Sequence, residues 1–329
     1  MQSRRNALNT WLRSCLSNEP FILLPLAGDA SFRRYYRLTQ ATSSYVVMDA
    51  PPPKEEIGPF VTLARHLRTL GLHTPAIVAQ APTAGFLLLE DLGDQVFLKT
   101  LTEENAERLY QRAMDTLLCL QQTPPPSLKL PSFDVSFMHQ EMALFQEWFL
   151  NAHLGLTLTT TESILLNGAL NWLASNIATQ PQVLIHRDFH SRNLMVLGNE
   201  ALAVLDFQDA MVGPAAYDLV SLLKDCYIQW PTTRITHWIQ YFYSHLPEPR
   251  SLSGAAFTRA FTVCGLQRHL KVLGIFCRLH LRDNKSNYLS DLPLTFQYVM
   301  NALPECPELL PLQHLMEDKV CTRFADLVS

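Results

Sequence analysis

Two short apolar runs that enclose a polar loop constrain this 329-residue chain more than any other feature of its sequence. The runs cover residues 183–185 and 201–205 and consist of Val, Leu, Ile and Ala. Apolar runs of this length, bounded by polar residues and turn signals, predict buried strands. The polar loop contains Asp188 and Asn193, and the second run ends directly before Asp206. The sequence therefore predicts that strands deliver three oxygen-bearing side chains to one part of the fold.

These three side chains are suited to phosphoryl transfer. That reaction needs a carboxylate within reach of the attacking hydroxyl, and oxygen ligands that hold Mg²⁺ on the phosphates of the nucleotide. We assign the role of base to Asp188 and the role of metal ligands to Asn193 and Asp206. The alternative is that all three are ordinary polar loop residues, which would require the strand, the loop, the hairpin and the final carboxylate to coincide by chance.

The same motifs carry a resemblance to a known family. The His-x-Asp loop and the Asp-Phe-Gln at Asp206 are similar to the catalytic loop and Asp-Phe-Gly site of protein kinases. They resemble more closely the aminoglycoside phosphotransferase and choline kinase branch, because residues 213–219 (Gly-Pro-Ala-Ala-Tyr-Asp-Leu) follow almost at once in place of a long activation segment. The amino-acid sequence of residues 188–195 and 205–210 looks like that of the bacterial anomeric kinases of N-acetylmuramate and N-acetylglucosamine.

The resemblance implies an α+β, protein-kinase-like fold of two lobes. Residues 1–91 would form a small, mainly β lobe that binds the nucleotide, and residues 92–329 a large, mainly α lobe for catalysis and the acceptor. ATP and Mg²⁺ would be the cofactors, and the partner would be a small amino sugar of cell-wall recycling that is phosphorylated on its anomeric hydroxyl. Asp218 would bond the backbone of the catalytic loop, and His186 would brace that loop.

Composition limits the other classes of function. With 48% apolar and 17% charged residues the chain reads as a soluble globular protein, and a net charge of -4 gives no reason to expect a nucleic-acid partner. Seven cysteines without a Cys-x-x-Cys pair favour reduced thiols and a cytoplasmic location. The first sixteen residues lack the apolar core of a signal peptide, and no apolar run approaches the roughly 20 residues of a membrane span.

The nucleotide is expected to contact two segments of the small lobe. A turn of small residues lies between strands expected at 21–26 and 35–38, and such a turn can present backbone N–H groups to phosphates. The segment that connects the lobes is expected to bind the adenine edge through its main chain. The alternatives are that the turn is an ordinary hairpin and that the connecting segment is a plain linker. The residues expected to contact the nucleotide are Gly28, Ser31, Phe32, Arg33, Glu90, Asp91 and Leu92.

One position departs from the kinase pattern. The lysine that grips the nucleotide phosphates should lie near the end of the strand at 45–50, but the residue there is Met48. Arg33, Arg34 or Arg37 could replace it, since a guanidinium binds phosphate oxygens as well as an ammonium does. The departure also leaves open a nucleotide-binding module without turnover.

The acceptor must lie beside Asp188 in a cleft of the large lobe. Mixed basic and acidic residues in that lobe favour a neutral or carboxylate-bearing sugar over a polycationic aminoglycoside. Kinases of other small alcohols, such as an aminoglycoside, choline or homoserine, remain alternatives, and each candidate outside the loops could equally be a core or surface residue. The acceptor candidates are Arg187, His190, Gln208, Asp209, Asp225, Tyr227, Trp230 and Arg268.

Overall fold

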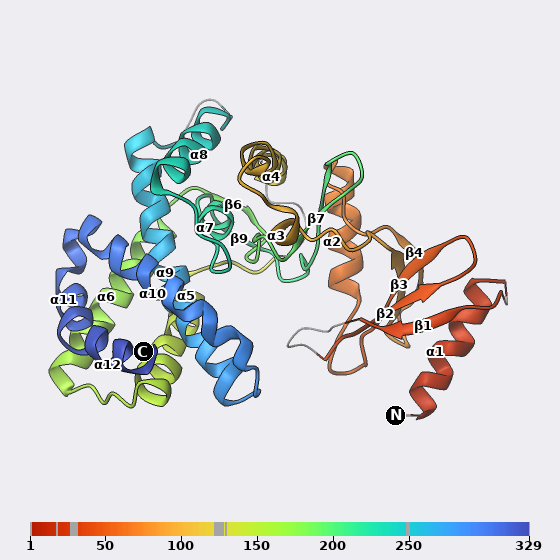
Figure 1. Cartoon of the computed structure of the whole chain (residues 1–329), viewed down its shortest axis with the longest axis horizontal. Coiled ribbons are helices and arrows are strands. Elements are labelled where there is room, and N and C mark those ends of the chain that lie inside the picture. Colours follow the sequence, from red (N-terminus) through yellow and green to blue (C-terminus); the bar gives the residue numbers. More distant parts are fainter. Residues whose placement is uncertain are drawn as a thin grey trace. The chain divides into compact units, whose positions relative to one another are not determined.

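A computed structural model of the chain describes all residues except 1, 18, 27–31, 122–127, 129, 248–250 and 329. The chain forms two compact units, each built from two segments. Unit 1 is Met1–Thr100 with Arg192–Gln208, and unit 2 is Leu101–Ser191 with Asp209–Ser329 (Figure 1). The sequence analysis drew its boundary after residue 91, and it did not foresee that a segment from the second half belongs to unit 1.

Unit 1 is organised around an antiparallel sheet of five strands in the order β1-β2-β3-β5-β4. The strands are β1 (Ile22–Pro25), β2 (Arg34–Thr39), β3 (Ser44–Asp49), β4 (Ile77–Ala81) and β5 (Phe86–Glu90). The chain opens with helix α1 (Gln2–Cys15), as the spacing of its apolar residues predicted. Leu8 and Leu12 of this helix pack with Leu38, Val47 and Phe86 of the sheet in one buried cluster. Burial of that apolar surface fixes α1 against the sheet.

Helix α2 (Gly58–Thr69) follows β3 and buries its apolar face at the predicted spacing. The helix ends at Gly71, whose φ of 86° is the left-handed value that a helix-terminating glycine supplies. Helix α3 (Phe97–Thr100) and the hairpin of β7 (Leu194–Val196) and β8 (Leu202–Val204) complete the unit. Bridges from His73 to Ala203 and from Val96 to Met195 join the hairpin to unit 1. These bridges explain why residues 192–208 belong to unit 1, although the segments before and after them belong to unit 2.

Unit 2 is mainly helical. Its helices are α4 (Ala106–Gln121), α5 (Val135–Leu144), η1 (Phe145–His153), α6 (Thr160–Ala178), α7 (Tyr217–Leu223), α8 (Thr232–Ser244), α9 (Gly254–Leu281), η2 (Ser286–Asp291), α10 (Leu292–Ala302), η3 (Leu303–Glu305), η4 (Pro307–Leu309), α11 (Leu310–Leu315), η5 (Met316–Val320) and α12 (Cys321–Val328). The strands β6 (Gln182–Ile185) and β9 (Met211–Pro214) form an antiparallel pair. The mixture of an antiparallel sheet and a helical unit confirms the α+β class.

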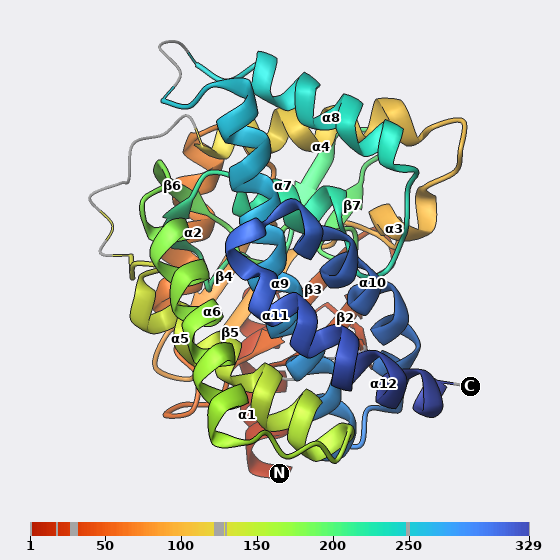
Figure 2. The ribbon, with the colours of Figure 1, turned by 90° about the vertical axis from the view of Figure 1, so that its left-hand side faces the viewer.

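Helix α9 is the centre of unit 2. It contacts α5, α6, α7, α10 and η1 and is buried over most of its length, as Figure 2 allows the reader to follow. The long, mostly apolar run at residues 257–281 is typical of such a core helix. Unlike a simple core helix, α9 also buries charged side chains, including Arg268 and Lys271. Buried charges need partners, so this helix is the first place to look for a polar site. Within the described residues no helix has both the length and the apolar character to cross a bilayer.

A close approach between α9 and the end of α5 occurs at Gly274. A Cβ atom at this glycine would lie 2.3 Å from the carbonyl carbon and 2.4 Å from the carbonyl oxygen of Leu144. Only a residue without a side chain fits so near another backbone. At this point α5 gives way to the π-helix Phe145–His153 (η1). Such wide turns are rare and often occur near functional sites.

Candidate functional site

A cavity of about 450 Å³ in unit 1 collects several of the predicted nucleotide residues. Glu90, Asp91 and Leu92 line it, together with Asn193 and Asp206 from the β7–β8 hairpin. Its apolar wall includes Val46, Phe60, Leu89, Met195, Leu205 and Phe207. We call it the strand-end cavity. Its size and its mixture of apolar walls with a few polar groups suit a small-molecule site.

The two predicted metal ligands are held together by the backbone of the hairpin. The N–H of Leu205 donates to the carbonyl of Asn193 at 2.9 Å, so Asp206 is the next residue after that bond. Asp206 has a φ of 60°, which is uncommon for a residue other than glycine and is typical of functional sites. The Nε2 of Gln208 donates to Oδ1 of Asp206 at 2.6 Å. Gln208, expected to contact the acceptor, therefore lies in the strand-end cavity instead.

The pair of Asn193 and Asp206 suits Mg²⁺ better than a transition metal. Among the residues that the structure describes, no three His, Cys, Asp or Glu side chains form a cluster that could hold an ion. Mg²⁺ does not need such a cluster, because it is usually bound through one or two carboxylates, water and the phosphates of the substrate. The carboxylate of Asp206 is exposed and can accept a ligand without further rearrangement.

Two acidic side chains of the interlobe segment are used within unit 1. The carboxylate of Glu90 lies 3.1 Å from Nε2 of His73 and accepts from the N–H of Ala76 at 3.0 Å. Asp91 pairs with Nε of Arg37 at 2.8 Å. Since these carboxylates are engaged, the segment can offer mainly backbone groups to a ligand, in line with the expectation from sequence.

The expected phosphate loop is only partly described. Gly28 and Ser31 lie outside the described residues, so their predicted contacts stay predictions. The ring of Phe32 is 59% exposed, and Nζ of Lys54 lies 4.4 Å from its centre. Phe32 is absent from the described lining of the strand-end cavity. Its predicted contact with the nucleotide gains no support from this position.

Met48, which occupies the position where kinases have the lysine, is fully buried on β3 and pairs with Tyr35 of β2. Tyr35 lines the strand-end cavity, and its pKa is raised to about 12, first by burial. The charge of Arg33 lowers the pKa of Tyr35, whereas the charges of Asp206 and Glu55 raise it. All three charged groups therefore lie near this tyrosine. The Nε of Arg33 lies 3.1 Å from Oε2 of Glu55.

The three candidate replacements for the lysine differ in their surroundings. Arg37 is held by Asp91 and by Asp94, whose Oδ1 lies 2.9 Å from its Nη1. Arg34 is exposed on β2. Arg33 is the one of the three that acts on Tyr35 together with the carboxylate of Asp206. Arg33 is absent from the described lining of the strand-end cavity and Arg37 belongs to it, so the role of Arg33 at the phosphates stays a prediction.

In unit 2, the backbone around Asp188 is fixed by a buried carboxylate. The N–H groups of His186 and Arg187 donate to the two oxygens of Asp218 at 2.5 and 2.9 Å. The N–H of Asp188 donates to Nδ1 of His186 at 3.3 Å. Both predicted supports of the catalytic loop are thus confirmed. Arg187 has a φ of 76°, so the loop is held in a conformation that it would not choose by itself.

The charges around Asp188 keep it ionised. Burial by itself would raise the pKa of Asp188, but the basic side chains around it, first Lys271, then His190, Arg187 and Arg268, outweigh burial and leave the pKa below its ordinary value. Glu141 links two of these groups, with Nζ of Lys271 at 2.6 Å and Nη2 of Arg187 at 2.8 Å from Oε1. Burial likewise opposes the ionisation of Glu141, and the same two cations lower its pKa below the ordinary value. The result is a rigid, ionised network around one carboxylate.

A pocket of about 330 Å³ opens beside this network, and we call it the Asp188 pocket. Arg187, His190, Tyr227 and Arg268 line it, as the sequence analysis predicted for the acceptor site. Burial lowers the pKa of His190, so this imidazole is neutral, and its buried Nδ1 makes no hydrogen bond. A neutral imidazole with an unused nitrogen can bind a hydroxyl group.

Cations exceed carboxylates in the lining of the Asp188 pocket. The lining carboxylates are Glu141 and Asp188, and the lining cations are Arg187, Arg268, Lys271 and Arg278. The sequence analysis missed Glu141, Lys271 and Arg278 as lining residues. A signal for the two cations was present, because Arg268, Lys271 and Arg278 are spaced by three and seven residues and so share one face of a helix. Nothing local marks Glu141.

Besides Gln208, three further predicted acceptor residues lie outside the described lining of this pocket. Asp225 accepts from the N–H and the Oγ of Ser191 at 2.9 and 2.5 Å, so it braces the catalytic loop. Trp230 is buried and donates to the hydroxyl of Tyr110 at 2.9 Å. Asp209 is exposed and contributes only its backbone carbonyl, 3.3 Å from Nη1 of Arg187. These positions favour structural roles for all three.

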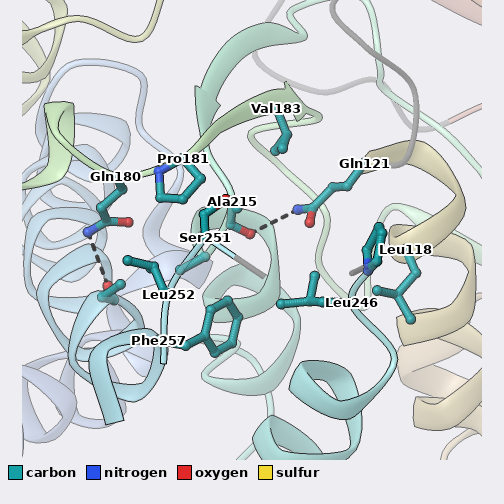
Figure 3. Close-up of a pocket in the computed structure, with 13 residues that line it drawn as sticks. Leu118, Gln121, Gln180, Pro181, Val183, Ala215, Leu246, Ser251, Leu252 and Phe257 are labelled. Atoms are coloured by element: carbon teal, nitrogen blue, oxygen red, sulfur yellow. Dashed lines mark hydrogen bonds between the residues drawn. The ribbon is translucent and has the colours of Figure 1, made fainter. Parts of the chain in front are cut away.

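A second cavity of unit 2, of about 220 Å³, has a different character (Figure 3). Among the residues that the structure describes, its lining contains no titratable side chain, and its polar lining residues include two glutamines. Nε2 of Gln121 donates to the carbonyl of Ala215 at 2.9 Å, and Nε2 of Gln180 donates to the carbonyl of Ala260 at 3.5 Å.

Sequence comparison agrees with the geometry. The model of the phosphotransferase enzyme family matches residues 22–254. A Pseudomonas aeruginosa protein named N-acetylmuramate/N-acetylglucosamine kinase is 40% identical, with 95% of this chain and 96% of that protein covered. A Neisseria meningitidis protein of the same name is 36% identical, with 96% of each chain covered. These relatives confirm the resemblance that the motifs predicted.

Solved structures agree on the fold. The aminoglycoside phosphotransferase APH(2'')-Ib, solved with ADP bound, has a TM-score of 0.61 at 17% identity, with 90% of this chain and 97% of that chain covered. Choline kinase LicA from Streptococcus pneumoniae has a TM-score of 0.64 at 11% identity, with 90% of this chain and 99% of that chain covered. The fold is therefore the protein-kinase-like α+β fold of these enzymes, as predicted.

Proposed function

The chain belongs to the phosphotransferase enzyme family, and we propose that it transfers the γ-phosphate of ATP to the anomeric hydroxyl of N-acetylmuramate and N-acetylglucosamine. The relatives that carry this activity in their names span nearly the whole chain. The cell-wall sugar recycling that such a product would serve, and a cytoplasmic location with all seven thiols free, are parts of the same proposal.

The observation that carries the proposal is the charge of the Asp188 pocket. Its lining cations outnumber its carboxylates, so a polycationic aminoglycoside would meet repulsion there. A choline-like cation would meet the same repulsion. An N-acetylated sugar has no amine to protonate, and N-acetylmuramate adds a carboxylate that such a pocket attracts.

In the proposed reaction Asp188 orients the sugar hydroxyl and accepts its proton. The lowered pKa of Asp188 keeps the carboxylate ionised near neutral pH, so it is a hydrogen-bond acceptor there. Glu141, Lys271 and Arg187 keep the surroundings of that carboxylate fixed. His190 and Tyr227 supply neutral groups for the hydroxyls of the sugar ring.

On the donor side, Asn193 and Asp206 would hold Mg²⁺ on the nucleotide phosphates. When bound, that ion neutralises charge on the phosphates during transfer. The main chain of residues 90–92 would bind the adenine, and Arg33 would take the place of the lysine that Met48 replaces. Contacts from Gly28, Ser31 and Phe32 are part of the proposal and follow from the family resemblance alone.

The decisive experiment is consumption of ATP against a panel of alcohols, followed by phosphorus NMR of the product. We expect turnover with the two N-acetylated sugars and a resonance of an anomeric phosphate. Turnover only with choline, homoserine or an aminoglycoside would identify a different alcohol kinase. Nucleotide binding without turnover would identify the non-catalytic module that Met48 leaves open.

A variant of the proposed base provides the matched test. Asp188→Asn keeps the size of the side chain and removes its charge, so kcat should fall by about 10²–10⁴. Binding of ATP should stay measurable by calorimetry, because the strand-end cavity lies in unit 1 and Asp188 in unit 2. An unchanged kcat would remove Asp188 from the mechanism.

A further inference from the structure

Three cations of α9 form a row along one side of the helix, and all three line the Asp188 pocket. They are Arg268, Lys271 and Arg278. With a rise of about 1.5 Å per residue, Arg278 originates roughly 10 Å beyond Lys271 along the helix axis. Lys271 is the leading cation among those that act on Asp188. Arg278 therefore lies toward the end of the pocket away from the reacting carboxylate.

The other cations of the pocket already have partners. Lys271 and Arg187 share Glu141 at 2.6 and 2.8 Å. Arg268 is buried and donates from Nε to Oγ of Ser221 at 2.7 Å. Each of these three cations therefore has a hydrogen-bonding or ion-pair partner within unit 2.

Arg278 differs from these cations. Its Nε is buried and makes no hydrogen bond, as is also true of Arg187, but unlike Arg187 and Lys271, Arg278 has no carboxylate within ion-pair distance in the described part of the chain. Burial, and next the charge of Arg282, lower the pKa of Arg278, while Asp283 and Glu147 act weakly in the opposite direction. A partly desolvated guanidinium without a partner gains from an anion that comes to it.

The two proposed substrates differ by an anion. N-acetylmuramate carries a lactyl ether on O3 that ends in a carboxylate, and N-acetylglucosamine has a hydroxyl there. With bonds of about 1.5 Å, that carboxylate lies roughly 6–8 Å from the anomeric oxygen. Arg278 lines the same pocket as Asp188 and originates about two helical turns past Lys271.

We propose that Arg278 binds the lactyl carboxylate of N-acetylmuramate and so determines the preference between the two sugars. The inference rests on the proposed function, because it assumes that both sugars enter the Asp188 pocket with the anomeric hydroxyl toward Asp188. The planar guanidinium can bind both carboxylate oxygens at once. N-acetylglucosamine makes no use of this contact, so Arg278 affects the two substrates differently.

The test compares kcat/KM for the two sugars in the wild type and in Arg278→Gln. We expect kcat/KM for N-acetylmuramate to fall about 10- to 100-fold, the effect of losing a charge-assisted hydrogen bond, mainly through KM. The value for N-acetylglucosamine should change less than about 3-fold. Arg278→Lys keeps the charge and loses the fork, so it should restore part of the loss.

A neighbouring arginine provides the matched control. Arg282 lies at the end of the same helix, is exposed, and pairs with Asp283 at 2.8 Å. Arg282→Gln removes the same charge one turn away and should leave the ratio between the two sugars unchanged. An unaltered melting temperature of Arg278→Gln would show that the variant is folded.

Three results would overturn the inference. Equal losses on both sugars would mean that Arg278 acts on the pocket in general, and no loss on either would mean that it makes no contact with substrate. A selective loss in Arg282→Gln as large as that in Arg278→Gln would reduce the effect to long-range charge. A wild-type protein that phosphorylates neither sugar would instead overturn the proposed function, and the inference with it.

Discussion

Gly274→Ala should destabilise the protein, although alanine is the better helix former. The new Cβ would lie 2.3 Å from the carbonyl carbon of Leu144 and 2.7 Å from the amide nitrogen of Phe145. Both are backbone atoms, so no side-chain rotation can relieve the contact. To reach the 3.4 Å of an ordinary contact, α9 and the start of η1 must separate by about 1.1 Å.

The magnitude follows from two opposing terms. Overpacking of a core costs typically 1–3 kcal/mol, and a clash between backbones belongs at about 3 kcal/mol. Alanine stabilises a helix interior by about 1 kcal/mol relative to glycine. The net loss is about 2 kcal/mol, which lowers the melting temperature of a unit of this size by about 4–8 °C.

The matched control is Gly265→Ala in the same helix. The nearest atom to its added Cβ is Cγ1 of Val220 at 3.6 Å, an ordinary contact, so only the gain in helix propensity remains. We expect this variant to be more stable by about 0.5–1 kcal/mol. Thermal unfolding followed by circular dichroism measures both changes.

Activity provides a second measurement for Gly274→Ala. A shift of α9 moves Lys271 relative to Asp188, and a misplacement of about 1 Å can cost on the order of 10²-fold in rate. Binding of ADP, which depends on unit 1, should be unchanged. If both glycine variants gain stability, the close approach at Gly274 is not a constraint and the reasoning fails.

The pKa of Asp218 is raised to about 6, first by burial. The stability that this group contributes is therefore fully present below about pH 4, and it is lost as the pH rises through about 6. Relative to Asp218→Asn, the wild type should lose about 3 kcal/mol between about pH 4 and pH 7 in thermal unfolding, and a difference independent of pH would contradict this. Asp206→Asn should weaken the Mg²⁺-dependent part of ATP binding, and calorimetry that finds equal Mg-ATP affinity would exclude it as a metal ligand. Arg33→Gln should raise KM for ATP about 10-fold or more, since it removes a charged contact to phosphate, whereas a value unchanged from the wild type would exclude Arg33 as the substitute for the lysine.

Local order in the sequence was enough to predict how the loop around Asp188 is supported. Asp188 and Asn193 lie five residues apart, and Asp206 follows the strand that returns beside them, so their supports could be inferred from spacing and resemblance. The bonds from the loop to Asp218 and His186 were foreseen for the same reason. Contacts between residues of one motif can therefore be predicted from the sequence.

The acceptor side was harder to predict, because its residues come from elements far apart in the chain. Glu141 lies on α5 and reaches Lys271 on α9, and neither residue belongs to a motif. Asp225 and Trp230 have the chemistry of sugar contacts, but packing turns them toward Ser191 and Tyr110. Such choices depend on tertiary packing, which single-sequence patterns do not encode.

The thioether at Met48 also determines which chemical probes can react with this protein. Nucleotide analogues that acylate or sulfonylate an amine beside the phosphates would find no nucleophile of that kind on β3, because Met48 is buried and carries no amine. Among the described lining residues of the strand-end cavity, the one lysine is Lys99, which is exposed on α3. A covalent adduct should therefore appear in the peptide that contains Lys99, and a survey that searches only for tagged strand lysines would overlook the enzyme.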